Sequence, residues 1–322
     1  MKNWFARLFG GPLHPEQAEL PTEHASPPSS VVNPPPSIDL DLVFFRWLAG
    51  PAVHAGAAPE GLILDELARL ARQPEAAADL VPRVPAVIPQ LLRSLRDESM
   101  SANELARQLA QDVTLVAEVI REVNSPYYRA SSKVSNIEGA LMLLGQNGLR
   151  LLLARVAFRP VIGLQTGRLA RQAAPQVWSQ SEKCAAAASL AAPALGANPF
   201  EAYLAGLMQN VGLIVAFRLM DQVAGTAALP QSDAFAHALL DSARTLSARI
   251  AALWELPPPV SQAILQAGQP DVTALAQALH TGDRLAKLRV LQGADVEGAE
   301  ELASALSGDQ QRIFDKLQLA DE

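Results

Sequence analysis

The sequence is poor in cysteine, in aromatic residues and in long apolar runs. Its only cysteine, Cys184, excludes a disulfide within the chain, so we expect a reducing compartment and a cytoplasmic protein. Aromatic residues make up 5% of the 322 positions. No apolar run approaches the roughly 20 residues that a helix needs to cross a bilayer. The sequence therefore predicts neither a disulfide-rich secreted scaffold nor a membrane-spanning segment.

Positive charge is also scarce. The chain has 26 Lys and Arg against 33 Asp and Glu, which gives a formal net charge of −7 and a pI near 5.3. Such a chain has no general attraction for phosphate backbones, so we expect no specific nucleic-acid partner. Cys184 lies in the Ala-rich run EKCAAAASLAA, which favours a buried small side chain over a reactive thiol.

Helix-forming residues dominate what is present. The chain is 49% hydrophobic, and Ala, Leu, Arg, Gln and Glu prevail after about residue 60, which predicts an all-α fold. Ser101 and Glu104 form a capping-box pattern at the start of one predicted helix. The next predicted helix ends near Asn124, because Pro126 disfavours the helical conformation of the residue before it.

Glycine and apolar runs define further predicted helices in the middle of the chain. Residues 136–158 predict two helices that are broken at Gly145 and Gly148. Residues 199–220 are apolar on all sides and predict one helix at the centre of a domain. We find no repeat of fixed period and no alternating strand pattern.

The first 37 residues differ in composition from the rest. The opening MKNWFARLFG places four apolar residues at helical spacing beside Lys2 and Arg7, namely Trp4, Phe5, Leu8 and Phe9. This segment is a weak membrane-surface anchor, a docking peptide or a tail without function. Residues 11–37 are rich in Pro, Ser and Glu and predict a flexible linker.

The segment Val81 to Ala154 resembles the N-terminal half of the HDOD domain, a bacterial signalling domain related to the HD metal-dependent phosphohydrolases. The resemblance is carried by Pro82 and Pro85, the capped helix, VNSPYY and SNIEGALMLLGQNGLR, and it continues more weakly through VWSQS, AYLAGLMQNVGLIV and AALWELPPPVSQAI. With the composition, it predicts five segments. They are a short N-terminal segment (residues 1–10), a linker (11–37), a helical extension (38–79), an HDOD-like domain (80–267) and C-terminal helices that pack on this domain (268–322).

The resemblance implies a site like that of the HD phosphohydrolases, in which histidines and aspartates hold one or two divalent metals that activate water. The equivalent positions here are Gln180, Gln209, Asn210, Ala243 and Asp283. Only Asp283 keeps a metal-binding side chain, and three amides and a methyl group cannot make a tight catalytic site. We therefore expect a former metal site without metal or cofactor, in which Gln209 and Asn210 belong to a buried polar cluster with Gln180.

A second set of residues offers an alternative metal site. His280 and Asp283 lie one helical turn apart, which suits two ligands of one ion, and His237 completes a candidate triad. This arrangement predicts a residual metal-dependent phosphohydrolase. A half-buried histidine that pairs with a neighbouring aspartate on an ordinary helix is the simpler interpretation.

Two groups of residues are candidates for an interaction surface. Asn124, Tyr127, Tyr128 and Arg129 combine aromatic and cationic side chains, which are favoured anchors of interfaces, although one tyrosine can equally pack on the core. Arg155 and Arg159 share a helix face that suits an acidic partner or an anionic messenger, or is simply solvated.

Taken with the resemblance, the sequence predicts a non-catalytic bacterial signalling protein, a pseudoenzyme that binds unidentified signalling proteins. The alternatives are the residual phosphohydrolase and a membrane-associated scaffold held weakly at a membrane surface by residues 1–10. The sequence leaves the oligomeric state open.

Overall fold

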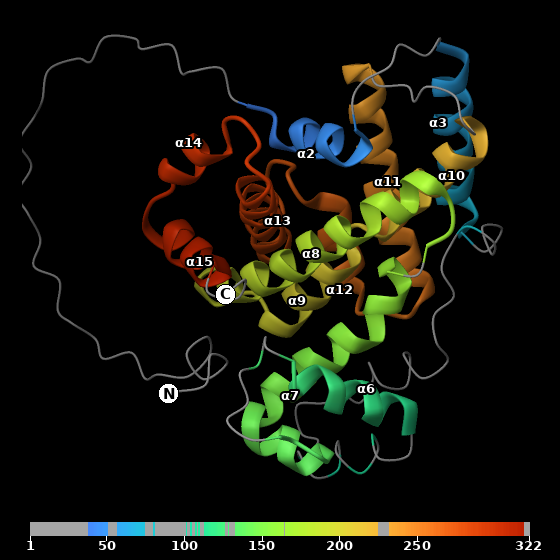
Figure 1. Ribbon diagram of the computed structural model, residues 1–322. Helices are drawn as coiled ribbons and strands as arrows, with labels where there is room; N and C mark the ends of the chain where they lie inside the picture. Colours follow the sequence, from blue (N-terminus) through green and yellow to red (C-terminus); the bar gives the residue numbers. More distant parts are fainter. Residues whose placement is uncertain are drawn as a thin grey trace, which may run out of the picture.

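The computed structural model describes residues 38–50, 57–74, 80, 101, 104, 107, 109, 113–125, 128, 133–163, 165–224 and 232–318. Within these ranges all regular structure is helical, so the all-α prediction is confirmed (Figure 1). The predicted N-terminal segment with Trp4, Phe5, Leu8 and Phe9 and the predicted linker 11–37 lie outside the described residues.

Two helices form the centre of the molecule. α8 (Arg168–Ala191) and α13 (Ala274–Gly293) share the most extensive helix contact of the fold, and α9 (Pro199–Met208) packs on α8 (Figure 1). A Cβ atom on Gly282 would lie 2.7 Å from the backbone nitrogen of Ala188. Only glycine permits this approach, so the small residues of α8 and Gly282 bring the two backbones together. The predicted C-terminal region 268–322 thus contributes a central helix.

The apolar segment predicted as one helix is two helices. α9 ends at Met208 and α10 (Val211–Ala224) begins after a turn at Gln209 and Asn210. Ser247 of α11 (Asp233–Leu253) joins the two, since its hydroxyl donates to the carbonyl of Gln209 at 2.6 Å and accepts the N–H of Gly212 at 2.8 Å. The prediction of one helix was wrong because a side chain from another helix forms hydrogen bonds with the backbone groups at the break between α9 and α10.

Between residues 101 and 163, the described helices begin and end largely where the capping and glycine patterns of the sequence predict. Ser101 and Glu104 bond reciprocally, Ser101 N–H to the carboxylate at 3.0 Å and Glu104 N–H to the hydroxyl at 3.3 Å, as a capping box does. α6 (Val113–Val123) ends before Asn124. α7 (Ile137–Gly163) is interrupted at Gly145, whose φ of 70° favours glycine, whereas Gly148 is helical and buried.

The remaining helices surround this centre. α2 (Leu40–Ala49) packs on α8, α11 and α13 through Leu40, Phe44, Phe45 and Leu48. α3 (Ala57–Arg72) lies against α10 and α11, and α12 (Pro258–Gln266) lies between α11 and α13. The short η3 (Ala192–Leu195) follows α8, and α14 (Ala299–Ser304) and α15 (Gly308–Gln318) pack on α13.

Two helical segments, residues 137–163 and 199–223, are long and apolar enough to cross a membrane by length and composition. This differs from the expectation drawn from the sequence. More than half of the first segment's most apolar stretch and most of the second's are buried inside the structure, as in helices of a protein core.

Candidate functional site

The predicted former metal site is a buried cluster of polar side chains. Gln180 on α8, Gln209 and Asn210 at the α9–α10 turn, and Asp283 on α13 meet there. Gln180 is fully buried, and Asp283 and Asn210 are nearly so. The close contact of α8 with α9 and α13 positions all four side chains, and four of the five predicted residues are therefore in mutual contact.

Asp283 is the acceptor at the centre of the cluster. The side-chain amides of Gln180 and Gln209 donate to the same oxygen, Oδ1, over 2.7 Å and 2.9 Å. Asn210 donates in turn to the amide oxygen of Gln180 and, at 3.2 Å, to the hydroxyl of Ser181. The amide groups thus present N–H donors, not oxygen ligands, to the carboxylate.

Ala243, the fifth predicted residue, is buried on α11 and serves packing. Its backbone carbonyl faces Gly212 so closely that a Cβ atom on that glycine would collide with the oxygen. Its own side chain is a methyl group, which adds no polar contact to the cluster.

Lys287, which the sequence interpretation missed, completes the cluster. Its ammonium group donates to Asp283 Oδ2 at 2.6 Å and to Asp41 Oδ1 at 2.7 Å, and its side chain is only 9% exposed. It also lies 5.9 Å from the ring centroid of Phe44 on α2. The signal in the sequence was the i, i+4 spacing of Asp283 and Lys287, which places them on one face of a helix.

Asp41, in the first turn of α2, closes the outer side of the cluster. Besides Lys287 it has Arg244 of α11 as a second cation, with Nη2 at 3.6 Å from Oδ2. Lys287 is the main reason that the pKa of Asp41 falls to about 2. Burial alone would lower the pKa of Lys287, but the carboxylates of Asp283 and Asp41 outweigh burial and raise it above the ordinary value. Asp41 and Lys287 are therefore both charged at neutral pH.

Cys184 borders the cluster as a buried thiol. It accepts a hydrogen bond from Gln209 at 3.0 Å, and burial raises its pKa well above the ordinary value. A thiol that stays protonated is a poor nucleophile, so the structure supports the interpretation as a buried small side chain.

The residues present do not fit the divalent metal of the HD phosphohydrolases. A catalytic metal needs about three basic ligands and an open position. Asp283, the one carboxylate at the expected positions, has one oxygen bound by two amide N–H groups and the other by an ammonium group. No described part of the chain brings three His, Cys, Asp or Glu side chains together as ligands.

The alternative site of His237, His280 and Asp283 is not formed. His237 is 51% exposed on α11, where its Nε2 faces the carboxylate of Asp39 at 3.5 Å. His280 is half-buried, and burial is the main reason that its pKa is lowered. The prediction of a three-ligand site was wrong because helical spacing joins only His280 to Asp283, whereas His237 lies on a different helix and faces α2.

Asn124 and Tyr128, predicted for an interaction surface, serve the structure of the domain. Asn124 donates to the carbonyls of Ile120 and Val134, both at 2.7 Å, and accepts from the N–H of Val134 at 2.9 Å. Tyr128 is 4% exposed, and burial raises the pKa of its hydroxyl. Tyr127 and Arg129 lie outside the described residues.

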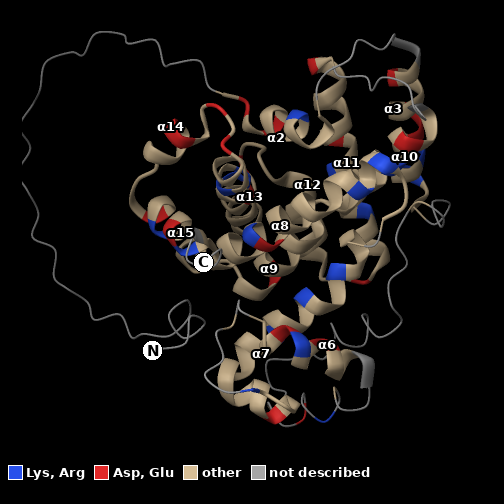
Figure 2. Cartoon of the chain, in the orientation of Figure 1, with Lys and Arg blue, Asp and Glu red and all other residues tan. Residues whose placement is uncertain are grey.

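Arg155 and Arg159 line a cleft of about 550 Å³ between α6, α7 and α8. Arg155 is mostly buried between Glu122 and Glu182, whereas Arg159 is 51% exposed and lies 3.1 Å from Glu122. Acidic and basic residues are thus interspersed where α6 meets α7 (Figure 2). Trp178, Pro160 and Pro175 provide the apolar wall of the cleft.

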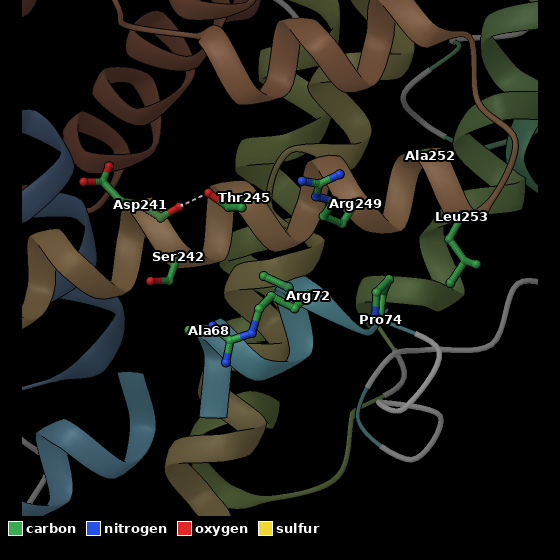
Figure 3. Close-up of a pocket in the computed structure, with 10 residues that line it drawn as sticks. Ala68, Arg72, Pro74, Asp241, Ser242, Thr245, Arg249, Ala252 and Leu253 are labelled. Atoms are coloured by element: carbon green, nitrogen blue, oxygen red, sulfur yellow. Dashed lines mark hydrogen bonds between the residues drawn. The ribbon is translucent and has the colours of Figure 1, made fainter. Parts of the chain in front are cut away.

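A second pocket, of about 710 Å³, lies between α3 and α11 (Figure 3). Arg72 and Arg249 line it, but their guanidinium groups point in different directions and do not converge on one point. Thr245 donates to the backbone carbonyl of Asp241 at 3.0 Å. No residue of the buried polar cluster lines this pocket, so the two features are separate.

Comparison with known families identifies the fold. The sequence profile of the HDOD domain matches residues 81–270, more than half of the chain. The chain belongs to the HDOD domain family. The match begins and ends close to the predicted boundaries of 80–267. It includes Gln180, Gln209 and Asn210, whereas the charged residues Asp41, Asp283 and Lys287 lie in the flanking helices.

Solved structures share this HDOD fold. An HDOD domain protein of unknown function from Geobacter sulfurreducens has a TM-score of 0.54 and 21% identity, with 80% of this chain and 95% of that one covered. A protein of Marinobacter aquaeolei VT8, provisionally described as a signal transduction protein, has a TM-score of 0.57 and 18% identity, with 83% and 65% covered. A protein of Shewanella amazonensis SB2B, provisionally described as a metal-dependent phosphohydrolase, has a TM-score of 0.52 and 16% identity, with 82% and 100% covered.

One relative is found by sequence among curated proteins. It is an uncharacterized protein of Treponema pallidum (strain Nichols), 27% identical over 139 residues. The alignment covers 42% of this chain and 26% of the relative, so this chain matches about a quarter of that protein's length. The HDOD profile establishes the family, and the solved structures show the fold.

Proposed function

We propose that this HDOD protein is a non-catalytic regulatory module of bacterial signal transduction, which acts in the cytoplasm by binding other proteins. The observation that carries the proposal is the state of Asp283. Its two oxygens are bound by the amides of Gln180 and Gln209 and by the ammonium of Lys287, and this pairing with protein donors supports a role without metal catalysis.

The cleft between α6, α7 and α8 is the surface we propose for partner binding. Half-exposed Arg159 lies at its edge, and Trp178 contributes a buried aromatic wall. Arginine and tryptophan are favoured at the centres of protein interfaces. The cleft lies within the segment that matches the HDOD family, and no residue of the buried polar cluster lines it.

The first experiment tests catalysis. Purified protein is assayed for metal content and for hydrolysis of bis(p-nitrophenyl) phosphate and of nucleotides with Mn²⁺, Fe²⁺ or Zn²⁺. We expect no metal-dependent turnover above that of the Asp283→Ala variant. Turnover together with stoichiometric metal, both lost in Asp283→Ala, would overturn the proposal of a non-catalytic module.

The second experiment tests binding. Proteins captured from the native cytoplasm by the full chain are compared with those captured by residues 38–322 and by the Arg159→Glu variant, with Arg72→Glu as a matched surface control. We expect specific partners that Arg159→Glu loses and Arg72→Glu retains. Equal capture by both variants would exclude the cleft, and membrane lipid retained only with residues 1–10 would favour a membrane scaffold.

A further inference from the structure

We infer that the ammonium group of Lys287 is the permanent cation of the buried cluster and takes the place of the divalent metal of the HD phosphohydrolases. The inference goes beyond the absence of metal ligands, because it names the group that replaces the metal's charge. It concerns only the cluster around Asp283, so it depends neither on activity at another site nor on which partner the protein binds.

The geometry around Lys287 is that of a cation between oxygen ligands. One nitrogen lies 2.6 Å from Asp283 Oδ2 and 2.7 Å from Asp41 Oδ1, and these carboxylates come from two helices. Separations of this length are typical of charge-assisted hydrogen bonds, so the ammonium binds both carboxylates directly. Lys287 follows Asp283 by one turn of α13, which keeps the cation covalently tied to the cluster.

Charge balance requires a cation at this place. Asp283 is almost fully buried, and a buried carboxylate is stable only when it is paired and hydrogen-bonded. Lys287 supplies the opposite charge, and Gln180 and Gln209 supply the remaining hydrogen bonds. A divalent ion would have to displace the ammonium or remain beside it against charge repulsion.

The amide groups are oriented for this arrangement. Gln180 and Gln209 direct N–H groups at Asp283, and the oxygen of Gln180 is already bound by Asn210. A metal at Asp283 would require both glutamines to reverse their amides and would break the bond to Asn210. The observed orientation of the two glutamine amides therefore fits a carboxylate whose charge is balanced by Lys287.

The replacement also ties α2 to the former metal site. Asp41 contributes the second carboxylate, while Phe44 and Phe45 of the same helix are buried and Phe45 stacks on Phe217 at a centroid distance of 6.1 Å. Both α2 and α13 lie outside the segment that matches the HDOD family. The flanking helices thus supply the cation and cover the outer side of the cluster.

The test removes the charge and asks whether a metal then enters. The full-length wild type is compared with Asp283→Asn, Lys287→Ala, Lys287→Arg and Lys287→Ala/Asp283→Asn, with Lys316→Ala on α15 as a control away from the cluster. All are treated with EDTA and titrated with Mn²⁺ and Ca²⁺. Melting temperature is followed by calorimetry and Mn²⁺ binding by electron paramagnetic resonance. We expect wild type and Lys316→Ala to bind no Mn²⁺ and to keep one melting temperature throughout.

Lys287→Ala should melt roughly 10 °C lower in EDTA, because two carboxylates lose their common cation. Its melting temperature should rise with Mn²⁺ or Ca²⁺, and the double variant should be more stable than Lys287→Ala in EDTA and insensitive to either ion. If Lys287→Ala does not fold, the double variant should still fold and Lys287→Arg should melt near wild type.

Stoichiometric Mn²⁺ on the wild type that is lost in Asp283→Asn would overturn the inference. So would a Lys287→Ala variant that is as stable as the double variant and indifferent to both ions. Metal-dependent hydrolysis that survives in Asp283→Asn would have a different meaning. It would overturn the non-catalytic function and leave the role of Lys287 intact.

Discussion

At the scale of single residues, the cluster depends on alternating charges that run from the interior to the surface. Asp283 is buried, Lys287 follows it outward, and Asp41 with Arg244 lies at the edge. Each charge is stabilised by an opposite one nearby, and the inner charges depend on this most because they have lost most of their hydration. A substitution that removes one of these charges therefore leaves the neighbouring charge without its partner.

Asp41→Asn should lower the free energy of unfolding by about 1 kcal/mol at pH 7, after allowance for the partial exposure of the carboxylate. Lys287 holds the folded-state pKa of Asp41 at about 2, below the ordinary value of 3.8. A depressed pKa stabilises the fold above the unfolded-state value, and this stability is lost as the pH falls through the folded-state value.

Urea unfolding of wild type and Asp41→Asn at pH 7, 5 and 3 measures this contribution. The difference between the two proteins should be the same at pH 7 and pH 5 and should fall to about half at pH 3. A difference that stayed constant down to pH 3 would mean that the charge of Asp41 does not stabilise the fold. Asp241→Asn, on the exposed side of α11, is the control.

At the scale of helices, glycine and capping side chains set the distances on which the cluster depends. Gly212 lets the start of α10 approach Ala243 on α11, and Gly206 lets α9 approach the backbone of Ala185 on α8. Because Gln209 and Asn210 lie between α9 and α10, these two contacts place both side chains. The buried polar cluster is thus a product of close helix packing.

Gly212→Ala should destabilise the protein by about 3 kcal/mol, because the new methyl group collides with a backbone carbonyl that cannot move freely. Gly61→Ala on α3 is the matched control, since nothing lies within 4 Å of the added atom. It should raise stability by about 0.5–1 kcal/mol through helix propensity. Chemical denaturation of the two variants should therefore give changes of opposite sign.

Asp221 of α10 caps the start of α8 across the fold. Its carboxylate accepts the N–H groups of Leu169 at 2.9 Å and Ala170 at 3.0 Å. Asp221→Ala should cost about 1–2 kcal/mol, and Asp221→Asn should recover part of this because its amide oxygen still accepts. If thermal unfolding showed no loss in Asp221→Ala, the cap would not contribute to stability.

At the scale of the whole molecule, helices that flank the HDOD segment complete its interior. α13 lies at the centre beside α8, and α2 covers the outer side of the cluster with Leu40, Phe44, Phe45 and Leu48 buried. The segment matched by the family, residues 81–270, includes neither of these helices. We infer that it needs them for a stable core.

Removal of residues 1–50 should therefore destabilise the protein far more than removal of residues 1–37. Each large apolar side chain of α2 that is lost removes roughly 1.5–3 kcal/mol of burial, and Lys287 loses Asp41 as well. Calorimetry of both truncated chains and of the full chain measures this. Equal melting temperatures of the two truncated chains would show that α2 does not stabilise the core.

The sequence by itself determined the features that depend on a few neighbouring residues. Helical periodicity, the capping box of Ser101 and Glu104, the helix end at Asn124 and the break at Gly145 are set by hydrogen bonds and backbone preferences within one or two turns. The sequence also predicted that Gln180, Gln209 and Asn210 belong to one buried polar cluster, because the resemblance to HD phosphohydrolases places all three at ligand positions.

Only the tertiary structure decided what those residues do together. The turn at Gln209 depends on Ser247, which lies 38 residues further along the chain, and the bond of Lys287 to Asp41 spans 246 residues. His237 was separated from Asp283 by the same packing. The physical reason is that a buried charge takes its partner from whichever helix packs against it, and the spacing of residues along one helix contains no information about its neighbour.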